Sequence, residues 1–218
     1  MGPLFQFAFA VIGSELLVAA RNNLDKFIVG AVLGVEALGI YFFVFNAGIG
    51  FALSLTGAVA ASIYPHLAEL ADKPRDMLAR YDGLLVRAVL PCAAVIALQA
   101  ALALIYVPVV FGDKWAAYAG VVALLCASAV SKPLYDGAAQ LMRAAGHPRI
   151  ELYGSAILTL LSLTALAAAL PSGLAAGVTA LALTTFALQA GFALTVRHLL
   201  FHRLDQTRRF PQFSGVPQ

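Results

Sequence analysis

Charged residues are scarce in this sequence. Of its 218 residues, 14 are Lys or Arg and 11 are Asp or Glu, so 11% are charged, whereas 61% are hydrophobic. An ordinary soluble domain carries roughly 25% charged residues, so neither a soluble enzyme nor a nucleic-acid-binding protein is expected. Disorder is also excluded, because a disordered chain needs low hydrophobicity and high net charge. The composition predicts a protein that is surrounded by lipid and has no nucleic-acid partner.

Cysteines and catalytic motifs are scarce as well. The two cysteines, Cys92 and Cys126, show neither a metal-binding spacing nor a disulfide framework, and we expect them to be small packing residues. The four histidines lie near predicted helix ends, which argues against a metal site and a hydrolytic triad within the membrane. The sequence also lacks the phosphate-binding motif G-x-x-x-x-G-K-[ST]. We therefore expect no enzyme activity, no metal and no cofactor.

Long uncharged stretches predict six transmembrane helices. A spanning helix needs about 20 predominantly apolar residues. The uncharged stretch 152–196 is too long for one crossing, and Pro171-Ser172-Gly173 within it predicts a turn. The expected fold is therefore all-α, one six-helix transmembrane bundle over residues 1–201 followed by a cytoplasmic tail, 202–218. The approximate spans are 4–34, 37–66, 84–108, 115–142, 151–170 and 174–199. A transmembrane β-barrel is not expected, because the apolar runs do not alternate in polarity.

The basic residues predict the orientation of these spans. Cytoplasmic loops carry an excess of Lys and Arg, and with six spans ten basic residues fall on one side and only Lys114 on the other. The ten are Lys73, Arg75, Arg80, Arg87, Arg143, Arg149, Arg197, Arg203, Arg208 and Arg209. We expect both termini to lie in the cytoplasm.

Ionisable residues also occur inside the first expected span. Such residues are costly in lipid and normally face a bundle interior or an aqueous cavity. At about 100° per residue, five polar side chains fall within an arc of about 140°. They are Glu15, Arg21, Asn22, Asp25 and Lys26. This face exceeds what helix packing alone requires, so we expect it to line a site.

The fourth and second expected spans carry weaker polar patterns. On the fourth, Lys132, Asp136, Gln140 and Arg143 share one face, and Lys132 and Asp136 stand four residues apart, where opposite charges can pair. Pro133 should bend the helix there. On the second, a line of small and polar residues is expected to serve close helix packing. It consists of Asn46, Gly50, Ser54 and Gly57.

Four segments resemble a known family in their order and intervals. They are Asn23–Gly30 in the first span, Leu38-Gly39-Ile40-Tyr41 opening the second, Ile63–Ala68 closing it, and Phe111-Gly112-Asp113-Lys114-Trp115 after the third. Over about residues 10–148, the chain resembles the C-terminal half of a polysaccharide-type flippase of the multidrug/oligosaccharidyl-lipid/polysaccharide exporter superfamily. The last two helices match only in length and hydropathy.

This resemblance implies a MATE-like lobe that takes part in alternating access. The implied substrate is an undecaprenyl-diphosphate-linked oligosaccharide of O-antigen, capsule or exopolysaccharide, and the implied location is the inner membrane of a bacterium. The cavity residues would be Arg21, Lys26, Lys132, Asn22, Asn46 and Gln140, and Glu15, Asp25 and Asp136 would balance charge or take a coupling ion, H⁺ or Na⁺. Such families have two six-helix halves, and Met1-Gly2-Pro3 leads abruptly into an apolar segment. We therefore expect a missing N-terminal half, a separate partner chain or a second copy.

Two other functions remain open at this point. A cation-coupled multidrug or metabolite antiporter of the same superfamily would favour acidic over basic residues in its cavity, whereas here three bases face three acids. The other alternative is a non-transporting membrane fragment.

Overall fold

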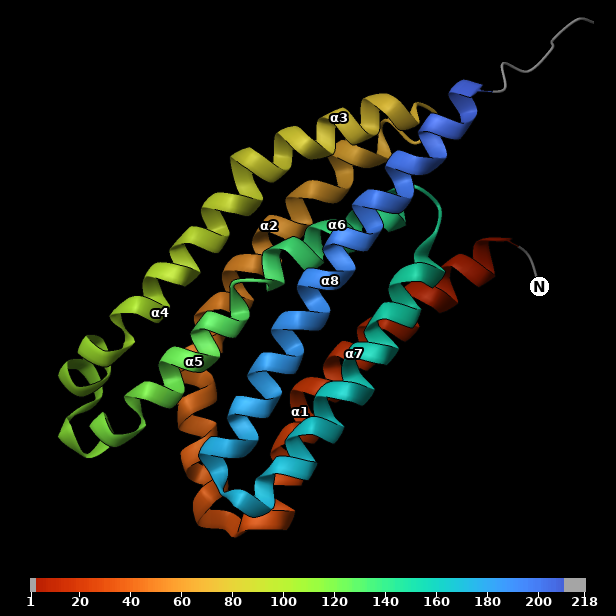
Figure 1. The fold of residues 1–218 in the computed structure, drawn as a ribbon. Helices are drawn as coiled ribbons and strands as arrows, with labels where there is room; N and C mark the ends of the chain where they lie inside the picture. Colours follow the sequence, from red (N-terminus) through yellow and green to blue (C-terminus); the bar gives the residue numbers. More distant parts are fainter. Residues whose placement is uncertain (1–2, 210–218) are drawn as a thin grey trace, which may run out of the picture.

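The computed structural model describes residues 3–209, with the side chains of residues 5–199, and builds this part of the chain from helices (Figure 1). The α-helices are α1 (Pro3–Phe45), α2 (Phe51–Ala68), α3 (Pro74–Leu84), α4 (Leu90–Phe111), α5 (Ala119–Ala129), α6 (Lys132–Ala144), α7 (Pro148–Ala169) and α8 (Leu174–Arg209). Two π-helical turns, Asn46–Gly50 and Leu85–Val89, join α1 to α2 and α3 to α4. Short 3₁₀ turns at Asp113–Tyr118 and Leu170–Ser172 complete the described part.

The helix α1 reverses direction at Gly34. This residue has φ 84° and ψ 179°, a combination that is open to glycine because it has no Cβ. Beyond the turn the chain folds back on itself, so the hydroxyl of Tyr41 lies 2.8 Å from a carboxylate oxygen of Asp25. In an unbroken helix, 16 residues of separation would place these two residues about 24 Å apart. The long helix is therefore a hairpin of two arms.

The described part of the chain has five helical runs long and apolar enough to cross a membrane, instead of the six separate helices that we expected. The runs are Phe5–Ala68, Pro74–Phe111, Asp113–Ala144, Pro148–Ser172 and Leu174–Leu199. The difference arises at Gly34, where the two expected first spans share one helical run that folds back within it. Helices also extend beyond the expected spans: α3 occupies much of the expected loop before residue 84, and α8 continues into the expected tail as far as Arg209. The rest of that tail, 210–218, lies outside the described residues.

The helices run roughly along one direction (Figure 1). The first arm of α1 packs along α7, α4 packs along α5, and α8 contacts α5, α6 and α7. The turn within α1, the turn from α4 to α5 and the turn from α7 to α8 lie at one end of the bundle. The start of α1, the turn from α2 to α3 and the last described turns of α8 lie at the other end.

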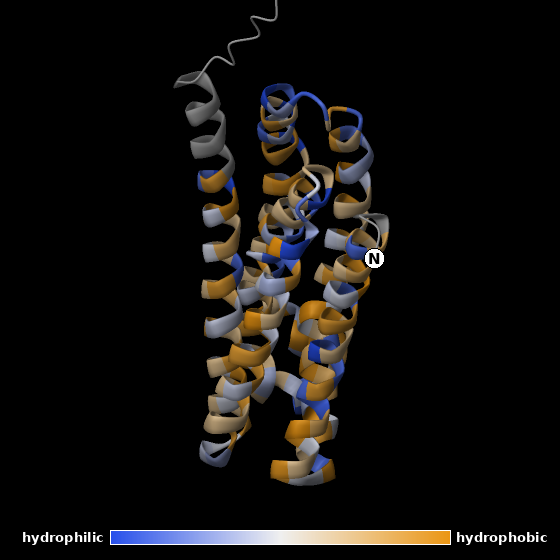
Figure 2. Ribbon diagram, turned by 90° about the vertical axis from the view of Figure 1, so that its right-hand side faces the viewer, coloured by the Kyte–Doolittle hydropathy of each residue, from blue (hydrophilic) through white to orange (hydrophobic). Residues whose placement is uncertain are grey.

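Hydrophobic side chains fill the core and also cover the outside of the bundle. The largest buried cluster is centred on Tyr41, Val122 and Leu166. Outward-facing residues such as Phe27, Val35 and Leu194 are more than 70% exposed. Figure 2 shows hydrophobic residues along most of the helices, with hydrophilic ones at their ends and in short patches between them. An apolar outer surface of this extent is what a bilayer would cover.

The π-turn at Asn46–Gly50 is held by side chains of two other helices. A π-turn interrupts the regular helical hydrogen bonds and is frequently found at functional sites. The amide of Gln99 in α4 donates to the carbonyl oxygens of Ala47 and Gly48 at 3.2 and 3.1 Å. The hydroxyl of Tyr106 donates to Ala47 at 2.8 Å, and the thiol of Cys126 in α5 to Gly48 at 3.3 Å. These contacts satisfy carbonyl groups that lipid could not, and so fix the turn in place.

Two expectations about packing residues have opposite outcomes. Cys92 and Cys126 are both free and buried, which confirms them as packing residues. The small-residue line of α2 was expected to pack against another helix, but Ser54 and Gly57 are exposed, as is Asn46 at its start. Small side chains permit a close helix approach without requiring one, so that prediction was wrong within the described residues.

Substitution at Gly34 tests the hairpin. We expect Gly34→Ala to lower the free energy of unfolding by about 1–3 kcal/mol, because a Cβ is strained at this positive φ. Gly39→Ala is the matched control, since Gly39 lies in the same helix without a positive φ and a Cβ there meets nothing within 4 Å. Unfolding in SDS measures both variants. Equal stability of Gly34→Ala and the parent protein would contradict the hairpin.

Substitution at Gln99 tests the support of the π-turn. Gln99→Leu removes donors to the Ala47 and Gly48 carbonyls, and we expect about 1–3 kcal/mol of destabilisation. Hydrogen exchange should accelerate at residues 46–54 and stay unchanged in α7. Unchanged exchange throughout α2 would show that the turn does not need this side chain.

Candidate functional site

Two cavities lie along α1, and the expected polar residues gather around them. The small cavity has a volume of about 60 Å³ and is lined from α1, α5, α6 and α8, among others by Arg21, Asn22, Asp25, Lys132 and Gln189. The large cavity, about 640 Å³, lies between α1, α2, α6 and α7. Lys132 lines both of them. The small cavity has room for only a few atoms, whereas the large one has the size of a typical ligand pocket.

Asp25 is a buried carboxylate held by the hairpin. It is 3% exposed and accepts the hydroxyl hydrogen of Tyr41 from the returning arm of α1. Its other oxygen accepts the backbone N–H of Lys26 at 2.7 Å and lies 3.5 Å from the ammonium of Lys26. A charged group in an apolar bundle needs this number of partners. The bend at Gly34 therefore positions Asp25.

Arg21 stands one turn before Asp25 and is the least satisfied charge in the site. The residue is 8% exposed and lies in the electrostatic range of Asp25, Tyr135 and Asp136. Its Nη1 atom is buried and has no hydrogen-bond partner. Leaving such a donor unsatisfied is costly, and Arg21 lines the small cavity. An anion in that cavity would supply the missing acceptor.

Lys132 and Asp136 form the ion pair that their spacing predicts. The ammonium of Lys132 donates to both carboxylate oxygens at 2.9 and 2.8 Å, and both side chains are less than 20% exposed. The expected break near Pro133 is also present, since α5 ends at Ala129 and α6 begins at Lys132. This break places the ammonium at the boundary of the two cavities.

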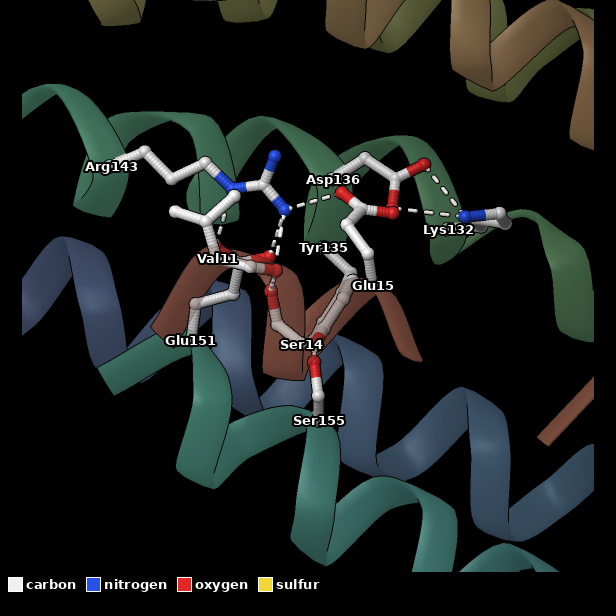
Figure 3. Close-up of polar contacts among 9 residues, drawn as sticks. All are labelled: Val11, Ser14, Glu15, Lys132, Tyr135, Asp136, Arg143, Glu151 and Ser155. Atoms are coloured by element: carbon white, nitrogen blue, oxygen red, sulfur yellow. Dashed lines mark hydrogen bonds and ion pairs between the residues drawn. The ribbon is translucent and has the colours of Figure 1, made fainter. Parts of the chain in front are cut away.

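Arg143 ties three helices together beside the large cavity (Figure 3). Its guanidinium donates to both oxygens of Glu151 in α7, at 2.6 and 2.5 Å, and to Glu15 in α1 at 2.7 Å. The side chain of Glu151 is 4% exposed, whereas that of Glu15 is 60% exposed. Nearby, the hydroxyl groups of Tyr135 and Ser155 are 2.7 Å apart. Arg143 therefore neutralises a buried acid and holds a second, accessible one.

The structure brings together most of the residues that the sequence predicted for the site. Glu15, Lys132, Asp136 and Gln140 line the large cavity, whereas Arg21, Asn22, Asp25 and again Lys132 line the small one. Two predicted residues line neither cavity. The ammonium of Lys26 lies 4.1 Å from the ring centre of Phe45 and donates to the carbonyl of Asn22, and Asn46 is exposed and donates to Phe42. Their membership of the polar face did not ensure a place in the site.

Several site residues were missed from the sequence. Arg143 was placed on the polar face of the fourth span with Lys132 and among the cytoplasmic basic residues, but not among the predicted cavity residues. Glu151 gave a weak signal as an acid in the first turn of α7. Gln189, whose amide oxygen accepts a hydrogen bond from Ser131 at 2.8 Å, gave no signal beyond being polar in an apolar span. Tyr41 could be linked to Asp25 only once the reversal at Gly34 was known.

The two cavities differ in charge. Around the large cavity, Glu15, Asp136 and Glu151 outnumber Lys132 and Arg143 by one. Around the small cavity, Arg21 and Lys132 outnumber Asp25 by one. Lys132 lines both cavities and is counted in each, so the difference is a surplus of one formal charge, basic at the small cavity and acidic at the large one. Among the described residues, no group of three or more His, Cys, Asp or Glu side chains is arranged to hold a metal ion.

The fold and the cavities define a multi-pass membrane protein with a charge-lined interior. Residues 1–120, more than half of the chain, match the family described as polysaccharide biosynthesis protein, and the chain belongs to this family. Comparisons with curated proteins and with solved structures found no match. The family match supports the resemblance that the sequence motifs suggested.

Removal of Arg143 tests the three-helix contact. Arg143→Gln leaves Glu151 buried without its counter-ion, and we expect a loss of about 3–5 kcal/mol in the free energy of unfolding. Glu15→Gln should cost no more than about 1 kcal/mol, because that carboxylate is mostly exposed. SDS unfolding measures both. The double variant Arg143→Gln/Glu151→Gln should recover part of the loss, and a double variant less stable than Arg143→Gln would contradict the pairing.

Proposed function

We propose that this chain translocates a lipid-linked oligosaccharide across the membrane, with one phosphate of its diphosphate held in the small cavity. The observation that carries the proposal is the unpartnered, buried Nη1 of Arg21 in a cavity with a surplus of basic residues. A diphosphate offers several charged oxygens to a guanidinium, which is well suited to bind them. Membership of a polysaccharide biosynthesis family supports the substrate class.

The geometry suggests how such a substrate would be handled. The small cavity has room for little more than a phosphate group, so the saccharide needs space elsewhere. The large cavity is adjacent at Lys132 and could accept it. With a phosphate at Arg21, the ammonium of Lys132 would release Asp136 and bind the substrate. Both residues belong to α6, so breaking their two hydrogen bonds would separate no helices. This sequence of events is binding and transport, with no catalytic step.

Further elements of the proposal concern topology and partners. With the hairpin at Gly34 counted as two crossings, the chain would cross the inner membrane of a bacterium six times, with both termini in the cytoplasm. A second six-helix lobe of a MATE-like transporter would complete the cavity. That lobe could come from the same polypeptide, a separate chain or a second copy. Glu15, the most accessible acid of the large cavity, would be the place for a coupling proton or Na⁺.

One observation favours a second candidate. The large cavity has one more acidic than basic side chain, and a cation-coupled multidrug or metabolite antiporter would use such a surplus. The unpartnered Arg21 speaks against it, because a cationic drug would be repelled from the small cavity. We therefore rank it below saccharide transport.

Transport of a defined substrate tests the proposal. In liposomes, the protein together with the lobe that completes its cavity should move a fluorescent undecaprenyl-diphosphate-linked sugar. Arg21→Gln should slow this transport by roughly 10- to 100-fold, since a hydrogen bond to a charged group is worth about 1.5–3 kcal/mol. Arg80→Gln, an exposed residue of α3, is the matched control and should transport normally.

Three outcomes would count against the proposal. Equal transport by Arg21→Gln and Arg80→Gln would remove Arg21 from the site. Movement of a cationic dye without movement of the sugar would favour the antiporter. No movement of either substrate by folded protein would favour a non-transporting role.

A further inference from the structure

A groove outside the two cavities lies where α1 and α7 begin. The apolar part of the groove has a volume of about 610 Å³, and the polar part has a volume of about 440 Å³. Gln6 and Arg149 line both parts, so they mark the boundary between them. The large cavity extends further along α1 to Val11 and Glu15, and Phe7 lines both this cavity and the polar part of the groove.

The walls of the apolar part are aromatic and open to the surroundings. Phe5 and Phe9 of α1 and Tyr153 of α7 are 54%, 66% and 65% exposed. In a chain that spans a membrane, such a concave surface near the end of the helices is filled by lipid. Tyrosine is enriched at this depth, because its ring suits the acyl region and its hydroxyl the head groups.

The charge at the boundary is positive and unbalanced. The guanidinium of Arg149 donates to the side-chain oxygen of Gln6 at 2.7 Å, which is a neutral acceptor. Among the described residues, no Asp or Glu lines either part of the groove. Glu151, the nearest acid along α7, is held by Arg143. His147 also lines the polar part.

We propose that this groove is a binding site for an anionic phospholipid of the bilayer. The acyl chains would lie along Phe5, Phe9 and Tyr153, the phosphate would bind Arg149, and the head group would occupy the polar part beside His147. Basic pockets between transmembrane helices are known to bind anionic head groups. The occupant is a bilayer lipid because the apolar part shares no lining residue with either cavity and its aromatic walls are exposed.

Quenching by brominated lipid measures this binding directly. Tyr153→Trp places a reporter in the groove, and Trp115→Phe removes the chain's one native tryptophan. The full chain is placed in nanodiscs of phosphatidylcholine with increasing dibrominated phosphatidylglycerol, or with dibrominated phosphatidylcholine instead. We expect phosphatidylglycerol to quench with about fivefold higher apparent affinity, which corresponds to about 1 kcal/mol for one arginine.

Variants of two arginines decide the outcome. Adding Arg149→Gln should bring the two lipids to equal affinity, whereas Arg80→Gln, an exposed arginine of α3 at the same end of the bundle, should leave the preference intact. A preference that survives Arg149→Gln, or equal quenching in the unaltered groove, would overturn the proposal.

A second measurement avoids the reporter substitutions. Native mass spectrometry of the otherwise unaltered protein should show phosphatidylglycerol retained after detergent exchange, and this adduct should be lost with Arg149→Gln. Displacement of the lipid by equimolar undecaprenyl-diphosphate-linked sugar would overturn the proposal, because the groove would then belong to the substrate. The lipid preference does not depend on transport, so its failure and the failure of the transport assay are distinguishable.

Discussion

The organisation of this protein depends on the cost of leaving a polar group unsatisfied where water is absent. Several buried or partly buried side chains meet that cost by pairing across helical segments. Tyr41 donates a hydrogen bond across the hairpin to Asp25, and Gln99 donates to carbonyl groups of the π-turn. Arg143 forms ion pairs with carboxylates of two other helices. Each contact fixes the relative position of two or three helical segments. In an apolar bundle whose side chains would pack in many registers, these few polar contacts select one arrangement.

Against this background, an unsatisfied group is informative. Most buried charges of the site have partners, but Nη1 of Arg21 has none, and it lies beside a cavity where basic residues exceed acidic ones. In native structures a buried donor usually has a partner in the protein, in ordered water or in a bound ion. The large cavity has the opposite surplus and an accessible carboxylate at Glu15. The two cavities, which share Lys132 as a lining residue, thus differ in the sign of their surplus charge.

The sequence predicted an all-helical membrane protein, the charged face of the first helix and the Lys132–Asp136 pair, because these follow from composition and helical periodicity. It did not reveal the partner of each charge. Arg143 and Glu151 stand eight residues apart on different helices, and Glu15 is more than a hundred residues from both, so their meeting depends on how α1, α6 and α7 pack. Periodicity also placed Lys26 and Asn46 in the site, although aromatic rings hold Lys26 and Asn46 faces outward. A helical wheel predicts the direction of a side chain but does not identify the residues that this side chain contacts.

The central claim is that Arg21 binds a phosphate of the diphosphate of a lipid-linked sugar in the small cavity. A photoreactive residue in place of Thr185, which lines that cavity, tests this most directly. On illumination, the protein together with the lobe that completes its cavity should form a cross-link to undecaprenyl-diphosphate-linked sugar. Arg21→Gln should reduce the yield of this cross-link at least tenfold. A cross-link of equal yield with Arg21→Gln, or with a lipid-linked sugar that lacks the diphosphate, would contradict the claim.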